Sequence, residues 1–348
     1  MAEDPTPDWR LLAPHRPLSP GDDAYVARPT SGGAAISTWV AAGGSTVLVS
    51  GPAGVGKSTE LAEAAQELGS ARVALFAQLD RVANMHRVSC DELMNFIADH
   101  LVKLARERFG LPVSDRLASF KSGGATRTQL ALAEIQRLAQ QRVVLVLDGL
   151  EKLPRCSSTR EIFDALAALP EFVDLVVVIP WHAAFGGGTD AILRPGEHLH
   201  RIAALDPAEG VAFLMQVFTR RLCLPAVPEA VLSLLSVAAW ESGGIPRVFL
   251  QLMADAGTYA RAQRGEAWPA AADLDQAIRD QEQSFRRALL PGDTKACFDV
   301  LNTDGRELDF ERRVRLLAQG ILLERSRDGE LVLEAHPLVA KAINNSRR

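Results

Sequence analysis

The stretch TVLVSGPAGVGKST, residues 46–59, constrains the fold of this chain more than any other feature. Four apolar or β-branched residues lead into the pattern G-x-x-x-x-G-K-[ST], which is completed by Gly56, Lys57 and Ser58. A helix-forming stretch over residues 60–68 follows at once. A strand, a glycine-rich turn and a helix in this order form the context that a phosphate-binding loop requires. The sequence therefore predicts a nucleotide-binding α/β domain.

Each part of this loop has a chemical role. Glycines let backbone N–H groups turn inward around phosphates, and the helix N-terminus adds free N–H groups and a positive dipole end. Lys57 is expected to reach the β- and γ-phosphates, and Ser58 to give its hydroxyl to Mg²⁺. The base-specificity pattern N-K-x-D is absent, which favours ATP over GTP. The expected nucleotide contacts of the loop are Gly51, Pro52, Ala53, Gly54, Val55, Gly56, Lys57, Ser58 and Thr59.

A second acidic feature follows an apolar run. Residues 143–147 read VVLVL and are followed by Asp148. Continuous apolarity is typical of a strand buried on both faces of a parallel sheet, and ligands bind at the carboxyl edge of such sheets. We expect Asp148, together with Ser58, to hold Mg²⁺. A plain strand-end turn is the alternative, and the phosphate loop upstream favours the metal role.

Apolar runs and helical patterns alternate over residues 36–205, which predicts a parallel sheet with helices on both faces. The last strand of this series is expected at residues 198–205. Residues 206–290 are helical in pattern, and residues 291–348 combine helices with a hairpin signal at Asp328 and Gly329. We predict an irregular N-terminal arm over residues 1–35, then the α/β domain, a helical lid and a winged helix.

Composition limits the remaining classes. The net charge of −5 argues against a protein that coats nucleic acid by bulk charge. The start MAEDPTPDWR lacks the pattern of a secretory signal, and the apolar run over residues 175–185 is too short for a membrane span. The four cysteines form no C-x-x-C pair. These features lead us to expect a cytoplasmic protein without a membrane partner.

With these pieces in place, the chain resembles the AAA+ and STAND signalling ATPases, the class that contains NACHT-type and origin-recognition-type ATPases. The phosphate loop is common to all P-loop proteins. Residues 147–151, LDGLE, look like the NACHT/STAND version of the second motif, in which an acidic residue follows the metal aspartate by three positions. Residues 243–247, GGIPR, are similar to the lid motif of the family. The order of core, lid and winged helix completes the resemblance, which implies ATP and Mg²⁺ as cofactors.

The resemblance also implies roles for single residues. Glu151 would polarise the attacking water, with Lys57 and Asp148 completing the catalytic set; a surface glutamate is the alternative for Glu151. Pro246 would shape the lid turn, and Arg247 would reach the γ-phosphate.

Three further assignments are looser. His182 is the polar residue after the strand that follows Asp148, where the family usually has Asn, Thr or Arg as its first sensor. Arg28 lies in a segment that passes beside the adenine or is a surface lead-in. An arginine finger from a neighbouring subunit is not singled out among Arg155, Arg160 and Arg220.

The chain lacks room for the effector domain and repeat sensor that STAND proteins usually carry, so we expect separate protein partners and a possible homo-oligomer. The leading hypothesis is a slow or partner-stimulated ATPase that acts as a molecular switch. A DNA-acting AAA+ ATPase is one alternative, although the winged helix has ten basic and ten acidic residues and only a local patch at Arg312, Arg313 and Arg315. A nucleotide-binding module with negligible turnover is the other, because Gly149 stands where many AAA+ proteins have glutamate.

Overall fold

The chain divides into two compact units. The sheet unit comprises Ser31–Ser50 and Lys57–Arg201, and the lid–wing unit comprises Met1–Thr30, Gly51–Gly56 and Ile202–Arg348. The phosphate-loop sequence passes from one unit to the other between Gly56 and Lys57. The computed structural model describes residues 7–13, 18–30, 32–43, 46–114, 123–169, 173–185, 197–224, 226–303, 308–327 and 330–345.

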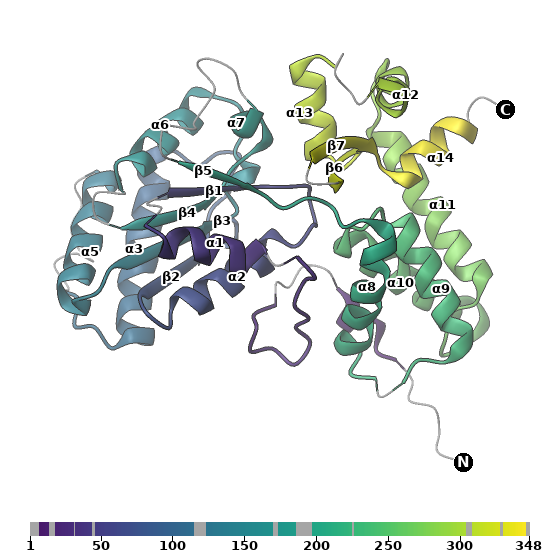
Figure 1. Ribbon diagram of the computed structural model, residues 1–348, viewed down its shortest axis with the longest axis horizontal. Coiled ribbons are helices and arrows are strands. Elements are labelled where there is room, and N and C mark those ends of the chain that lie inside the picture. The colour runs from purple at the N-terminus through teal and green to yellow at the C-terminus, as the bar shows by residue number, and fades with distance from the viewer. Residues whose placement is uncertain are drawn as a thin grey trace. The chain divides into compact units, whose positions relative to one another are not determined.

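The sheet unit is built on five parallel strands in the order β2-β3-β4-β1-β5 (Figure 1). The inner strands β1, β3 and β4 are buried along their whole length, which explains their continuous apolar sequences. The edge strand β5 ends at Arg201, four residues earlier than expected, and Ala204 instead donates its N–H to the carbonyl of Glu324. The strands are β1 (Thr46–Ser50), β2 (Val73–Gln78), β3 (Val143–Asp148), β4 (Asp174–Val178) and β5 (His198–Arg201).

Helices cover both faces of this sheet. Alternate strand residues such as Leu75, Leu145 and Leu175 share one apolar core with α3, α5 and α6. The intervening residues, such as Val144, point to the opposite face, where α2 contacts β2 and β3 and α1 packs on α2. This arrangement confirms the predicted α/β fold. The helices are α1 (Gly32–Ala41), α2 (Lys57–Leu68), α3 (Cys90–Phe109), α5 (Gly124–Ala139), α6 (Ser157–Ala167) and α7 (Trp181–Phe185).

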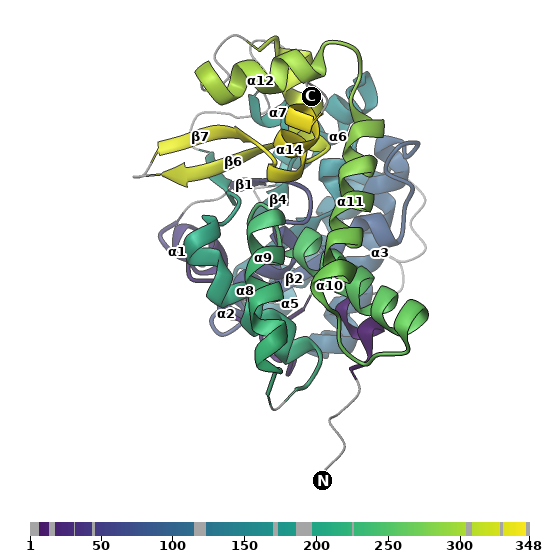
Figure 2. The ribbon, with the colours of Figure 1, turned by 90° about the vertical axis from the view of Figure 1, so that its right-hand side faces the viewer.

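The lid–wing unit contains a helical part followed by a part that combines helices with two antiparallel strands, as expected for the predicted winged helix (Figure 2). The helical part is α8 (Pro207–Arg221), α9 (Glu229–Glu241), α10 (Pro246–Tyr259), a π-helical turn (Ala260–Arg264) and α11 (Ala271–Ala288). The second part is α12 (Asp293–Thr303), α13 (Phe310–Ala318), the antiparallel strands β6 (Leu322–Arg327) and β7 (Glu330–Ala335), and α14 (Pro337–Asn345).

The expected hairpin turn at Asp328 and Gly329 lies outside the described residues, although the two strands that it joins pair as expected. Across the described ranges, no helix combines the length and apolarity that spanning a bilayer needs. The boundaries proposed at residues 35, 205 and 290 stay predictions.

The N-terminal arm contains more structure than its composition indicates. A short 3-10 helix, η1 (Trp9–Leu12), buries both of its terminal side chains. The Trp9 ring lies 6.2 Å from the ring of Phe218 and meets Trp268 edge to face at 5.9 Å. Burial of a large aromatic ring offsets the entropy cost of ordering a proline-rich segment. The proline and glycine content concealed this anchor.

Candidate functional site

The sheet unit gathers polar side chains where β3 ends. Asp148 closes this strand with only 3% of its surface exposed. One of its carboxylate oxygens accepts a hydrogen bond from the N–H of Gly149 at 2.9 Å, and its carboxylate is also hydrogen-bonded by the Ser58 side chain. Lys57 is buried in the first turn of α2. The residues predicted to hold Mg²⁺, Ser58 and Asp148, therefore lie together.

Burial and neighbouring charges act on the carboxylate of Asp148. Burial, followed by the nearby charge of Glu151, raises the pKa of Asp148 to about 6, although the Ser58 hydrogen bond and the Lys57 charge act in the opposite direction. The Oε2 atom of Glu151 is buried and has no hydrogen-bond partner in the part of the chain that the structure describes. Hydroxyl and carboxylate oxygens are the ligands that Mg²⁺ prefers. The donor set of Ser58 and Asp148 thus fits this ion.

An ion pair beside Glu151 was not predicted from the sequence. Asp80 follows β2 directly after Leu79, and β2 is paired with β3 so that Gln78 lies opposite Asp148. The carboxylate of Asp80 forms an ion pair with Lys152. Glu151 and Lys152 lie in the same short turn, η3 (Leu150–Lys152).

Gly149 makes this close approach possible. Its φ of +94° lies in the left-handed region, and a Cβ added there would lie 2.9 Å from the Cβ of Asp80. The turn that carries Glu151 is therefore held against the end of β2. A signal was available in the sequence, because an aspartate follows an apolar run at Asp80 as it does at Asp148.

The loop residues that precede Lys57 belong to the lid–wing unit. Gly54 and Gly56 have φ values of +80° and +108°, a conformation that side-chain-bearing residues rarely adopt. Val55 is buried and donates its N–H to the carbonyl of Pro52 at 3.3 Å. Pro52 is buried, whereas Ala53 is exposed, and Thr59 lies half-buried in α2. The loop has the backbone form expected from its glycines.

Arg28 supports this loop. It is 8% exposed and donates from Nη1 to the carbonyl of Val55 at 3.0 Å and from Nη2 to the carbonyl of Ala203 at 2.5 Å. No local sequence pattern predicts these contacts, which join residues 27 and 175 positions apart. A nucleotide contact by Arg28 stays a prediction, and the observed contacts brace the loop backbone.

The lid motif lies directly against the same loop. Pro246 occupies the first turn of α10, where its missing N–H costs nothing, and Ile245 precedes it as the N-cap. The N–H of Arg247 donates to the carbonyl of Gly54 at 3.3 Å. A Cβ added at Gly54 would lie 2.5 Å from the Cβ of Arg247. The exposed Arg247 side chain thus projects from a helix turn whose backbone is hydrogen-bonded to the predicted phosphate loop.

The positions of the remaining predicted residues do not distinguish between their possible roles. His182 is half-buried in α7, just beyond β4. The three arginine-finger candidates Arg155, Arg160 and Arg220 are all exposed, so the structure does not choose among them.

Comparison with known proteins supports the core assignment. Residues 35–179 match the family described as AAA ATPase domain. No curated protein matches the chain in sequence. The fold is similar to that of the Walker-type ATPase paby2304 of Pyrococcus abyssi, with a TM-score of 0.61 and 15% identity over 96% of this chain and 99% of that one.

Two further solved structures share the fold. Cdc6p from Pyrobaculum aerophilum has a TM-score of 0.53 and 15% identity, and the match covers 98% of this chain and 99% of that one. The Orc1 protein of Aeropyrum pernix, solved in complex with DNA, has a TM-score of 0.53 and 16% identity, with 98% and 97% covered. At these identities the similarity concerns the fold alone. The family match over residues 35–179 and the shared fold together support an AAA+/P-loop ATPase core.

Proposed function

We propose that this AAA+/P-loop ATPase core serves an ATP-dependent molecular switch, in which the nucleotide state controls the arrangement of lid and winged helix and the assembly with partner proteins. The observation that carries this proposal is the contact between Arg247 and Gly54. Because the lid motif and the phosphate loop share a hydrogen bond, a conformational change in the loop would alter the position of the start of α10. The proposed output is association with separate protein partners or with further copies of the chain.

Hydrolysis needs a group that accepts a proton from the attacking water. Glu151 is the proposed acceptor, because its Oε2 atom is buried without a partner among the described residues and its turn is held by the Asp80–Lys152 ion pair. Lys57 would neutralise charge on the β- and γ-phosphates, while Ser58 and Asp148 would hold Mg²⁺. When bound, Mg²⁺ would supply positive charge that stabilises the negative charge of the phosphates.

The switch step would follow from the loss of the γ-phosphate. Arg247 is proposed to bind this group through its guanidinium, which forms strong charge-assisted hydrogen bonds with phosphate oxygens. After hydrolysis, that attraction is lost and the lid motif is released. Such a local electrostatic change with a domain-level result is a common switching device.

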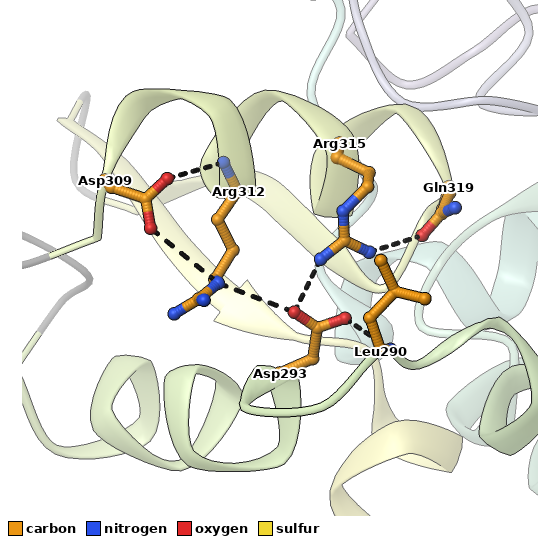
Figure 3. Close-up of polar contacts among 6 residues, drawn as sticks. All are labelled: Leu290, Asp293, Asp309, Arg312, Arg315 and Gln319. Atoms are coloured by element: carbon orange, nitrogen blue, oxygen red, sulfur yellow. Dashed lines mark hydrogen bonds and ion pairs between the residues drawn. The ribbon is translucent and has the colours of Figure 1, made fainter.

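The winged helix favours a protein partner over DNA. Arg315 of α13 contacts the fully buried carboxylate of Asp293 at 2.5 Å and donates to Gln319 at 3.3 Å (Figure 3). Arg312 lies 3.6 Å from Asp293 and 3.7 Å from Asp309 (Figure 3). These two members of the expected basic patch are therefore neutralised within the unit, which weakens their attraction for a phosphate backbone.

The test compares ATP and ADP binding in Arg247→Ala with the wild type. We expect the variant to bind ATP about tenfold more weakly, a loss of about 1.4 kcal/mol, and ADP within about twofold of wild type. Arg87→Ala, a change at another exposed arginine, serves as the matched control. An equal loss for both nucleotides, or no loss, would contradict the proposed reading of the γ-phosphate.

A further inference from the structure

A charged side chain is buried in the lid–wing unit. Arg325 belongs to β6 of the wing and is 2% exposed, which places it among the largest fully buried side chains of the described residues. Burial lowers the pKa of its guanidinium below the ordinary arginine value. Burying a charge is unfavourable unless the charge is well paired, and an apolar side chain would avoid that cost. The partners of Arg325 therefore call for an explanation.

The guanidinium joins three separate segments. Its Nε atom donates to Glu334 on the neighbouring strand β7 at 2.8 Å. Its other two nitrogens reach beyond the wing: Nη2 donates to the carbonyl of Gly243 at 2.7 Å, and Nη1 donates to the carbonyl of Leu205. Gly243 begins the lid motif, and Leu205 belongs to the connector of residues 203–205 between β5 and α8. The planar fork of arginine suits such simultaneous contacts, whereas lysine is a point charge.

Backbone contacts close the same junction. The N–H of Ala204 donates to the carbonyl of Glu324 at 2.8 Å, and the N–H of Leu205 donates to the carbonyl of Gly244 at 3.3 Å. Gly244 has a φ of +73°, and a Cβ added there would lie 2.1 Å from the Leu205 carbonyl oxygen and 3.2 Å from Nη1 of Arg325. The connector, the lid motif and β6 thus meet without room for another side chain.

Both segments held by Arg325 continue to the phosphate loop. On one side, the lid motif ends at Arg247, whose N–H donates to the carbonyl of Gly54. On the other side, the connector begins at Ala203, whose carbonyl accepts from Arg28, and Arg28 also donates to the carbonyl of Val55. Two routes of direct contact therefore run from adjacent loop residues to one guanidinium.

We propose that Arg325 is a positioning residue that couples the phosphate loop to the wing, so that a nucleotide-induced shift of the loop reaches β6 and β7 through residues 203–205 and 243–247. This inference rests on the proposed nucleotide switch and assigns the route of its signal. The contacts of Arg325 with the two carbonyls fix the register of the lid motif and the connector against the wing. Without the fork, the loop still binds nucleotide, but the wing no longer responds.

Hydrogen exchange of the full chain, read by mass spectrometry, tests this route. Exchange is measured with no nucleotide, with ADP and with a non-hydrolysable ATP analogue, in peptides covering residues 46–60 and residues 322–335. In wild type we expect nucleotide to slow exchange in both peptides. In Arg325→Met we expect protection of the loop peptide to persist, with nucleotide affinity within about threefold of wild type, and the response of the wing peptide to fall by about fivefold or more.

Arg327→Met is the matched control. Arg327 lies on the same strand and pairs with the same Glu334 at 2.5 Å, but its described contacts do not include the connector or the lid motif. This variant should respond as wild type does. If Arg325→Met fails to unfold cooperatively and is therefore not properly folded, the same exchange experiment is carried out on Arg325→Lys. An ammonium retains the charge but does not span both carbonyls, so the wing response should be reduced in this variant as well.

The outcomes separate the two proposals. If neither nucleotide slows exchange of the loop peptide in wild type, the proposed function itself is contradicted. Loop protection in wild type without a response of the wing contradicts the coupling alone. A wing response that persists in Arg325→Met, or that is lost equally in Arg327→Met, also overturns the role given to Arg325.

Discussion

The ammonium group of Lys152 forms an ion pair with the carboxylate of Asp80, a residue 72 positions earlier in the chain. The pair joins the turn after β3 to the turn after β2. Because Glu151 occupies the position before Lys152, the ion pair restricts where its carboxylate lies. The geometry of the proposed catalytic group thus depends on a contact between two strand ends.

Breaking this pair should slow hydrolysis without weakening nucleotide binding. We expect Lys152→Met and Asp80→Asn each to lower the ATP turnover rate about tenfold, because a misplaced base loses much of its effect. The double variant should show about the same loss as each single one, since both changes remove one interaction. Phosphate release and nucleotide titration measure the two quantities. Additive losses would show that the two residues act separately.

Glu151 itself is expected to affect the chemical step. Glu151→Gln keeps the shape of the side chain but removes the proton acceptor, so turnover should fall about a hundredfold or more while the ATP dissociation constant changes little. Glu161→Gln, the same change at an exposed position of α6, should leave both unchanged. An unaltered rate in Glu151→Gln would remove this residue from the mechanism.

Local sequence patterns predicted those parts of the structure that depend on neighbouring residues. Ser89 is followed three residues later by Glu92, a spacing typical of a capping box, and the two form one at the start of α3, with the Ser89 N–H donating to Glu92 at 2.9 Å. The apolar run before Asp148 forms β3, and the GGIPR motif of residues 243–247 leads into α10. In each case, the signal and the structure lie within a few residues of each other.

The features that were missed depend on distant residues. Nothing in the local sequence LLERSR of β6 predicts that Arg325 is buried; two carbonyls from other segments accept hydrogen bonds from its guanidinium. The supporting role of Arg28 likewise depends on Ala203, 175 positions away. No local pattern encodes such pairings, because they arise only when the connector, the lid motif and the wing come together.

The buried carboxylate of Asp293 should contribute to the stability of the winged helix. It accepts hydrogen bonds from Arg315 and from the N–H of Leu290, which lies 2.7 Å away (Figure 3). Asp293→Asn removes the charge that pairs with Arg315 and Arg312, so we expect the free energy of unfolding to fall by about 1–3 kcal/mol. Asp275→Asn, at an exposed site of α11, should change it by less than about 0.5 kcal/mol. Urea unfolding measures both.

His336 should make stability depend on pH. It is 1% exposed and accepts a hydrogen bond at Nδ1 from the N–H of Leu338 at 3.2 Å. Burial, with the nearby charge of Arg325, lowers the pKa of His336 to about 3. In the unfolded chain the imidazole has a pKa of ~6.5. Below that pH the unfolded state binds a proton that the folded state does not bind, so acid favours the unfolded state.

The His336 contribution is therefore complete above pH ~6.5 and is lost as the pH falls toward 3, by up to about 1.4 kcal/mol per pH unit. Urea unfolding of wild type and His336→Asn between pH ~7.5 and ~5 measures this slope. The variant retains an acceptor for the Leu338 N–H but lacks the titrating ring, so its slope should be smaller. Equal slopes would mean that other groups account for the pH dependence.

Mass measured by light scattering with ATP, with ADP and without nucleotide, alongside phosphate release, tests the proposed switch most directly. The account predicts that ATP raises the mass and that the mass returns to its starting value as ATP is hydrolysed. An unchanged mass in all three conditions, with nucleotide bound and no phosphate released, would contradict a self-assembling switch. That result would favour a nucleotide-binding module that depends on another protein.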